Sequence, residues 1–264
     1  IVAGLTSWLV ARAGHVSDVW HELANRVALR FARVSIRDAE GARGHLLSAV
    51  AQDPGFARAH EALAELCWFE GYLGLLPPRD AIAAGTLHAV RALEIDGTRA
   101  ETHALLAQFH KQFDYSWPEI QRGLSRARAM NPASTLVRGL QVIGWLMPQG
   151  RIDEGIAELE DVLARDPLSM WANHWLGVML VLARQWARVS AHSRAMIELD
   201  PASPWGHWLF AAGCRGLNLT DEAIAANRRA VELSGGWHFM LGWLGLMLGV
   251  AGRNREAQDV LGQL

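Results

Sequence analysis

The sequence has few cysteines and almost no lysine. Its 264 residues include two cysteines, Cys67 and Cys214, and a single lysine, Lys111; the other basic residues are arginines spread among nearly equal acidic ones. Two cysteines are too few for a disulfide framework or a cysteine-rich metal site. A formal net charge of −2 without a basic block does not indicate nucleic-acid binding. We therefore expect no nucleic-acid partner, and the low cysteine content favours a reducing, cytoplasmic compartment.

Long apolar runs are also missing. The opening "IVAGLTSWLV" is apolar but much shorter than the ~20 residues that span a bilayer. It lacks the basic start and the cleavage pattern of a secretory signal. The sequence thus predicts no membrane segment, and we expect residues 1–19 to form an N-terminal helical extension.

Motifs of catalysis and cofactor binding are not found. The chain has no phosphate-binding glycine loop, dinucleotide fingerprint or nucleophile elbow. Three of the eleven histidines, His60, His103 and His207, recur at one repeat position, and both cysteines stand thirteen residues after a recurrent proline. Such recurrence indicates a packing role. We expect no catalytic residue, no metal and no cofactor, and a binding protein more than an enzyme.

The sequence has an internal period instead. "DP" or a close relative returns before successive helix-like segments, and after one longer first interval these pairs follow one another at nearly constant spacing. A period of about 34 residues is typical of helical-pair repeats, and the spacing here is close to it. The wider first interval predicts an insertion near residues 69–80, which should lengthen one helical hairpin. The landmarks are Asp53-Pro54, Asp96-Gly97, Asn131-Pro132, Asp166-Pro167, Asp200-Pro201 and Ser234-Gly235.

These repeats resemble the tetratricopeptide repeat (TPR) family over about residues 20–264. The segments "HWLG" at 174–177 and "GWLG" at 242–245 are similar to its first-helix signature. Residues 94–132 also resemble the repeat arrays of bacterial winged-helix regulators, adenylate cyclases and serine/threonine kinases. The resemblance implies an all-α, right-handed superhelical solenoid of about seven antiparallel helix pairs with one concave groove. It also implies a single domain over 1–264. The repeats would span about 20–54, 55–97, 98–132, 133–167, 168–201, 202–235 and 236–264.

The same resemblance implies which side chains face the groove. In this family the first helix of each repeat lines the groove, about four, seven, eleven and fourteen residues after the landmark. In the later repeats this rule predicts an aromatic wall of Trp171, His174, Trp205, Trp208 and Phe239. Trp171, Trp205 and Phe239 each stand one repeat period apart and should form a ladder.

In the earlier repeats the same positions are mostly polar, and the predicted binding residues are Arg58, Glu61, Glu65, Glu101 and Lys111. A groove that is polar at one end and aromatic at the other suits an elongated amphipathic guest, so we expect a protein or peptide segment as partner. Family members that dock chaperone tails hold a terminal carboxylate with a Lys/Asn/Arg clamp, which this chain does not keep.

Three alternatives remain open. The aromatic end could bind a small hydrophobic or cationic molecule, or be catalytic with His174 moving protons. Aromatic residues at helical spacing also fit an interior that the protein or a second subunit covers, as we expect for Trp175 between repeats and Trp186 within a pair. Finally, Leu261 and Leu264 lie on an apolar face of the last helix, which predicts a homodimer through the C-terminal repeat.

Overall fold

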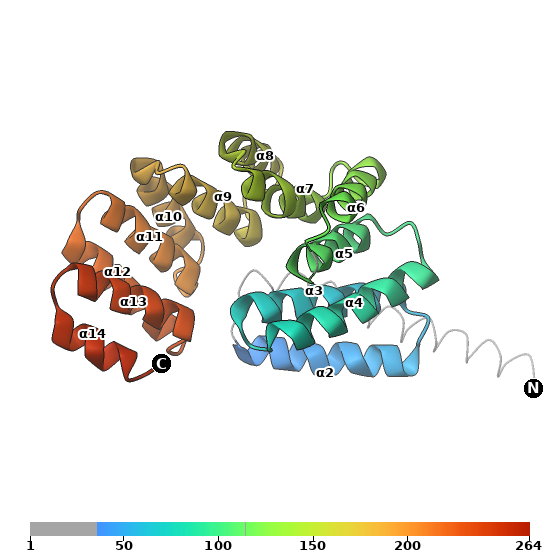
Figure 1. Cartoon of the computed structure of the whole chain (residues 1–264), viewed down its shortest axis with the longest axis horizontal. Coiled ribbons are helices and arrows are strands. Elements are labelled where there is room, and N and C mark those ends of the chain that lie inside the picture. The colour runs from blue at the N-terminus through green and yellow to red at the C-terminus, as the bar shows by residue number, and fades with distance from the viewer. Residues whose placement is uncertain (1–35, 114) are drawn as a thin grey trace, which may run out of the picture. The chain divides into compact units, whose positions relative to one another are not determined.

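The computed structural model describes residues 36–113 and 115–264, and all regular secondary structure there is helical (Figure 1). The expected extension at 1–19 and the start of the first repeat lie outside the described residues. The chain divides into two compact units, which we call the N-terminal unit (1–137) and the C-terminal unit (138–264). No described helix is long and apolar enough to span a bilayer.

The N-terminal unit is a series of helices in which each packs on the next along the chain. The helix α3 also contacts α5, the first helix of the following repeat. This unit holds α2 (Ile36–Gln52), α3 (Ala57–Leu73), α4 (Pro78–Ile95), α5 (Ala100–Phe113), α6 (Trp117–Met130) and the first residues of α7 (Thr135–Gln141).

The C-terminal unit continues this pattern after an irregular start. The helix α7 passes into a π-helical turn, η2 (Val142–Leu146), and a 3₁₀ turn, η3 (Met147–Gln149). The sequence does not predict this change, although the polar Gln141 stands directly before it. There follow α8 (Ile152–Arg165), α9 (Met170–Leu182), α10 (Trp186–Leu199), α11 (Pro204–Gly216), α12 (Thr220–Leu233), α13 (His238–Val250) and α14 (Asn254–Leu261).

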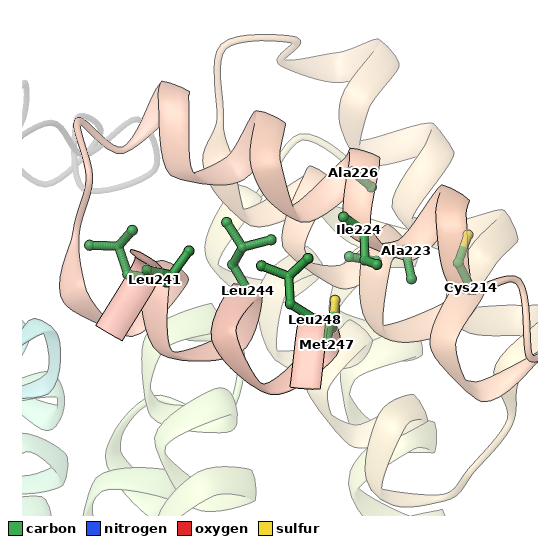
Figure 2. Packing of buried hydrophobic residues seen from close by; sticks show 10 residues of the cluster. Cys214, Ala223, Ile224, Ala226, Leu241, Leu244, Met247 and Leu248 are labelled. Atoms are coloured by element: carbon green, nitrogen blue, oxygen red, sulfur yellow. The ribbon is translucent and has the colours of Figure 1, made fainter. Parts of the chain in front are cut away.

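The core of the C-terminal unit forms where these helices meet. Leu241, Leu244 and Leu248 of α13 pack with Ile224 of α12 and with residues of α11 and α14 (Figure 2). Each helix contributes one apolar face, so a repeat buries its apolar surface only against its neighbours. This is the packing of a helical repeat.

The recurrent Asp-Pro and Asn-Pro pairs end the second helix of a repeat. Asn131, Asp166 and Asp200 have φ of −140°, −135° and −144°, outside the helical range. Proline disfavours the α conformation in the residue before it, so the helix stops at this point. The next first helix begins only a few residues later.

A second backbone feature repeats within the hairpins. Gly150, Arg184, Asn218 and Gly252, each one repeat period after the one before, have φ of 70°, 55°, 62° and 73°. Tyr115 takes the same left-handed conformation in the hairpin of the preceding repeat, with φ of 52°. The turn between the two helices of a pair is thus fixed by one left-handed residue, whichever side chain stands there.

The expected insertion lengthens the α3–α4 hairpin. These helices have 17 and 18 residues, whereas α9 and α10 have 13 and 14. The break comes earlier than the two prolines suggest: Gly74, with φ of 69°, ends α3, and Pro78 is already the first residue of α4. A Cβ at Gly71 would lie 2.8 Å from the Cβ of Ala81, so a glycine there allows the two helices to approach.

The recurrent histidines bind the landmark turns. His103 Nε2 lies 3.1 Å from the carbonyl oxygen of Gly97, and His207 Nε2 lies 3.4 Å from that of Pro201. His60 hydrogen-bonds the Pro54 carbonyl in the same way, and in the fifth repeat Asn173 Nδ2 donates to the Pro167 carbonyl at 3.1 Å. Each side chain stands six residues after its landmark. These contacts give the recurrent histidines a structural role.

Candidate aromatic binding surface

Three first helices of the C-terminal unit, α9, α11 and α13, carry most of the predicted aromatic residues. Ser169 precedes α9, and its hydroxyl accepts a hydrogen bond from the Ala172 backbone at 3.3 Å. Pro204 occupies the first turn of α11, where its missing N–H is not needed. Trp171, Trp205 and Phe239 are therefore each the second residue of their helix.

Trp205 lies at the centre of a network of ring contacts. Its ring centroid is 4.3 Å from that of His174 and 6.0 Å from that of Trp208, both in edge-to-face orientation. It lies 5.4 Å from the ring of Trp237 and 6.1 Å from that of Phe239. Edge-to-face pairs at these distances add about 0.5–1.5 kcal/mol each beyond area burial. We call the residues of this network, with Trp171, Trp175 and Trp243 at its edges, the aromatic cluster.

Trp171 joins the cluster differently from the expected ladder. Its ring contacts Trp175 at 6.4 Å, and Trp175 contacts His174 at 5.3 Å, so Trp171 connects to Trp205 through these two side chains. The other side of the Trp171 ring covers α7, where a Cβ at Gly139 would lie 1.8 Å from Cζ3. The first rung thus packs on the preceding repeat.

The cluster has an inner and an outer layer. His174 and Trp208 are only 8% and 6% exposed, because neighbouring rings cover them. Trp175 is buried to the same degree. The outer layer consists of Trp171, Trp205, Trp237 and Phe239, which lie at the helix starts and stay partly exposed; Trp243, further along α13, is partly exposed as well. A guest would therefore contact the outer layer, while His174 and Trp208 support it from below.

The inner layer is electrically neutral. Burial lowers the pKa of His174 to about 3, so its imidazole is uncharged at neutral pH. The buried indole nitrogen of Trp208 finds no hydrogen-bond acceptor among the described residues. Further along α13, Leu246 is exposed. Gly242 and Gly249, about one turn before and after it, are exposed as well.

Three members of the cluster were not among the predicted site residues: Trp175, which was expected between repeats, and Trp237 and Trp243. Trp237 stacks on Phe239 at 4.9 Å and stands two residues after its landmark, where earlier repeats have Ser169 and Ser203. The groove rule takes positions four, seven, eleven and fourteen residues after the landmark, so it did not include this aromatic residue. Trp243 contacts Trp208 at 5.5 Å. It shares a repeat position with Trp175, and this recurrence was the signal that could have found it.

Trp186, which was expected to pack within its own helix pair, also contacts the next repeat. Its ring packs against the end of α11, where a Cβ at Gly216 would lie 2.1 Å from Trp186 Cδ2. Trp186 thus joins its own repeat to the following one.

The predicted polar residues lie in the N-terminal unit, and Glu61 is fully engaged there. Its Oε1 accepts from Arg58 at 3.0 Å and from Arg99 at 2.7 Å. Its Oε2 accepts from Arg99 Nε at 2.9 Å and from Thr102 Oγ1 at 2.6 Å. This carboxylate is 4% exposed and fastens α3 to α5. The two-point Arg99 contact is the strongest geometry for such a pair.

Three of the other polar candidates interact with Glu61 or with Glu65, which lies beside it. One turn along α3, burial and the charge of Glu61 raise the pKa of Glu65 to about 7. Glu101 accepts a hydrogen bond from Asn131 at 3.2 Å, and burial lowers the pKa of Lys111. Arg58, Glu61, Glu65 and Glu101 thus interact in one charged group, with Arg58 and Glu101 both acting on Glu65.

Neither an exposed thiol nor a metal-binding group of side chains is found among the described residues. Cys67 and Cys214 are both buried, and burial raises the pKa of each thiol. No group of three or more His, Cys, Asp or Glu side chains within residues 36–113 and 115–264 is placed to hold a metal ion.

Comparison with known proteins identifies the fold. No protein-family model and no curated protein matches the chain. Among solved structures, PilW, a type IV pilus biogenesis factor, superposes with a TM-score of 0.60 at 15% identity over 78% of this chain and 91% of that one. PilF of Pseudomonas aeruginosa gives 0.53 at 18% identity, over 75% and 86%. A human IFIT1 dimer with PPP-AAAA gives 0.60 at 16%, over 93% and 71%.

PilW and PilF are TPR proteins. The paired helices, the repeat period and these superpositions together show that the chain has a TPR-like helical-repeat fold.

Proposed function

We propose that this chain is a non-enzymatic binding module that holds an extended apolar peptide segment against the outer layer of the aromatic cluster. One observation carries the proposal: the partly exposed rings of Trp205, Trp237 and Phe239 meet at the starts of two consecutive first helices. Each ring keeps part of its apolar surface accessible beside the next one, and a contiguous apolar patch of this kind on a monomer is often a binding site.

The spacing of the rings supports a peptide as guest. Alternate side chains of an extended strand lie on one face about 6.6 Å apart. Trp237 and Phe239 lie 5.4 and 6.1 Å from Trp205, so side chains at positions i and i+2 of a guest fit beside neighbouring rings. Because His174 is uncharged, the surface favours apolar side chains over acidic ones.

The alternatives of a cationic guest and of catalysis by His174 are less well supported. Arg215 already lies 5.8 Å above the ring of Trp243, so the protein's own cation uses that aromatic face. A histidine with a pKa near 3 is a poor proton carrier at neutral pH, because an effective general base has a pKa near the working pH.

A peptide titration tests the proposal. The probes are two ten-residue peptides of equal composition, one with Leu at alternate positions and one with the leucines in a single block. We expect the alternating peptide to bind more tightly. Trp205→Ala should weaken that binding by about 2 kcal/mol or more, roughly thirtyfold, while it lowers the melting temperature less than the loss of a fully buried ring does.

Matched substitutions make the test decisive. Trp117→Ala removes a more exposed tryptophan from α6 of the N-terminal unit and should leave binding unchanged. Trp208→Ala removes a buried ring and should lower the melting temperature strongly. The proposal fails if Trp205→Ala binds like the parent protein, or if it loses as much thermal stability as Trp208→Ala.

We also propose self-association through α14. Leu261 and Leu264 are 62% and 59% exposed at the end of the last repeat. Light scattering at micromolar concentration should give the mass of a dimer, and Leu261→Glu should give that of a monomer. A monomeric mass for the parent protein would contradict this part of the proposal.

A further inference from the structure

The helices that carry the aromatic cluster hold a single formal charge. Apart from the histidines, Arg215 is the one acidic or basic side chain among the residues of α9, α11 and α13. The second helices α10 and α12, by contrast, each carry both acidic and basic side chains. Binding surfaces are commonly apolar with a small number of polar groups that fix the orientation of the ligand and supply its specificity. Arg215 is the candidate for such a group.

Arg215 approaches the cluster from the last turn of α11. It stands two helical turns after Trp208, so both residues lie on one face of the helix. A long side chain in a helix points back towards the N-terminus, and here it reaches the cluster. The guanidinium carbon lies 5.8 Å from the centroid of the Trp243 ring, and Trp243 contacts Phe239 of the outer layer at 6.5 Å. The charge is therefore adjacent to the proposed peptide surface.

The guanidinium of Arg215 is available to a partner. Its side chain is exposed, and no carboxylate within residues 36–113 and 115–264 forms an ion pair with it. Other exposed arginines of the unit are paired, for example Arg188 with Glu160. A contact between a cation and a ring is not a conventional hydrogen bond, so the N–H donors of Arg215 can still bind a carboxylate at two points.

We infer that Arg215 selects guest peptides that carry one acidic side chain beside their apolar residues. The inference rests on the proposed peptide binding and adds a charge requirement to it. The carboxylate accepts hydrogen bonds from the guanidinium, while the apolar side chains lie on the outer layer. Same-face side chains of an extended strand are about 6.6 Å apart, close to the 6.5 Å between the rings of Phe239 and Trp243. The acidic residue therefore stands about two to four residues from the side chain that contacts Phe239.

The acidic group belongs to a side chain within the guest, because the apolar face of α13 continues past Trp243. Leu246 is exposed one turn further along this helix. A Cβ at Gly249 would meet no atom within 4 Å, so the space above that turn is open as well. A guest chain can thus run on beyond Arg215. A terminal carboxylate would require it to stop there.

Arg215 also suits its place in the helix. A basic side chain in the last turn interacts favourably with the helix dipole whether or not a guest is bound. This role affects the stability of the protein and not the choice of guest. Measuring both quantities on the same variants separates the two roles.

Matched peptides test the charge requirement. Each has ten residues, blocked ends and Leu at alternate positions. One Asp stands two residues after the last Leu or two residues before the first, because a guest can run in either direction. Each control peptide has Asn in place of Asp. At low ionic strength one of the Asp peptides should bind about three- to fivefold more tightly than its control, the upper range for an exposed charge pair. About 1 M salt should reduce this difference, because it screens exposed charges.

Variants of Arg215 isolate the contribution of its charge. Arg215→Met keeps a flexible side chain beside the Trp243 ring and removes the charge, so the preference for Asp over Asn should disappear. Arg215→Glu should bind a peptide with Lys in place of Asp about threefold more tightly than the parent protein does. The matched control is Arg194→Met. Arg194 is also exposed and lies 5.0 Å above the Phe210 ring, but it belongs to the second helix α10, and its variant should keep the full preference.

The inference is overturned if the Asp and Asn peptides bind the parent protein equally. It is also overturned if Arg215→Met keeps the preference, whatever its melting temperature, or if Arg194→Met loses it. A preference that appears only when the carboxyl end is unblocked would assign Arg215 to a chain terminus and would contradict the inference too.

The alternating and block leucine peptides distinguish this failure from that of the proposed function. If the alternating peptide still binds more tightly than the block peptide while Asp and Asn are equivalent, only the charge requirement fails. If no alternating peptide binds, the proposed function fails and the inference fails with it.

Discussion

The two units have chemically different buried side chains at the same repeat position. Seven residues after their landmarks stand Glu61 in the N-terminal unit and His174 and Trp208 in the C-terminal unit. All three are less than a tenth exposed. In one unit this position holds a carboxylate with two arginines and a threonine around it, and in the other it holds uncharged rings. At these three positions the side chain is buried in both units, and its neighbours determine which chemistry is tolerated there.

The buried ion pair of the N-terminal unit and the aromatic cluster of the C-terminal unit should respond differently to the loss of one side chain. A buried ion pair depends on each partner, because removing one leaves an uncompensated charge in the interior. A cluster of rings depends on area and shape, so the loss of one contact is partly shared by the others. The predictions that follow test this difference, beginning with the largest expected effect.

Glu61→Gln should lower the free energy of unfolding by about 3–5 kcal/mol, because it leaves Arg99 without its two-point partner. Urea unfolding followed by circular dichroism measures this loss. Glu119→Gln breaks an ion pair with Arg122 on the surface and should cost less than about 1 kcal/mol. If the two variants unfold at the same urea concentration, the charged group around Glu61 does not stabilise the N-terminal unit.

The sequence could predict the repeat but not these partners. Landmark spacing and helical periodicity are properties of single segments, so the helix pairs and the lengthened hairpin were accessible from the sequence. The contact between Glu61 and Arg99 joins two repeats, and its existence depends on how one repeat packs on the next. The same holds for Trp171 on Gly139 and for the π-helical turn after Gln141, where local pattern contains no signal.

The second prediction concerns pH and the N-terminal unit. The pKa of Glu65 is about 7 in the folded protein, above its ordinary value of 4.5, so the folded state favours the protonated form. Its contribution to stability is complete below pH 4.5 and is lost as the pH rises through about 7, by about 3 kcal/mol at most. Hydrogen exchange of α3 should therefore accelerate between pH 5 and 8, after correction for the intrinsic rate.

Glu65→Gln should remove this dependence and slow the corrected exchange of α3 at pH 8. The substitution keeps the size of the side chain and deletes the charge that Glu61 repels. An unchanged pH profile in the variant would show that another group in the unit is responsible.

In the C-terminal unit the pH dependence should have the opposite sign. The folded-state pKa of His174, about 3, lies below its ordinary value of 6.5. Its contribution is complete above pH 6.5 and is lost as the pH falls towards 3. Hydrogen exchange of α9 and α11, corrected for the intrinsic rate, should therefore accelerate on acidification. His174→Phe should reduce this acceleration. A smaller part should remain because burial also lowers the pKa values of His192 and His207. A full acid response in His174→Phe would contradict the assignment.

A pair of glycines at one repeat position tests the packing of the aromatic cluster. A Cβ at Gly139 would meet the Trp171 ring at 1.8 Å, whereas one at Gly242 would meet no atom within 4 Å. We expect Gly139→Ala to cost about 1–3 kcal/mol through displacement of Trp171. Gly242→Ala should be neutral or stabilising by about 0.5–1 kcal/mol, since alanine favours the helix.

We would compare the melting temperatures of Gly139→Ala and Gly242→Ala, together with the near-ultraviolet circular dichroism of their tryptophans. Equal stability of the two variants would show that Trp171 does not rest on α7. A loss of peptide binding in Gly139→Ala alone would connect this contact to the outer layer of the cluster.

The smallest expected effect comes from the backbone that both units share. Arg184 takes the left-handed conformation at a turn where the equivalent residues one repeat before and one repeat after are Gly150 and Asn218. A side chain with a Cβ costs roughly 1 kcal/mol in this conformation, while glycine adds some freedom to the unfolded chain. Arg184→Gly should therefore stabilise the protein by about 0.5 kcal/mol, and Gly252→Arg should destabilise it by a similar amount. The side chain of Arg184 is exposed, so each substitution should change stability mainly through the conformational preference of the backbone. Thermal unfolding of both variants would show whether the energetic cost of a side chain is the same at the two turns. If Arg184→Gly lowers the melting temperature instead, the arginine contributes a contact that outweighs its backbone strain, and the turn is not interchangeable between repeats.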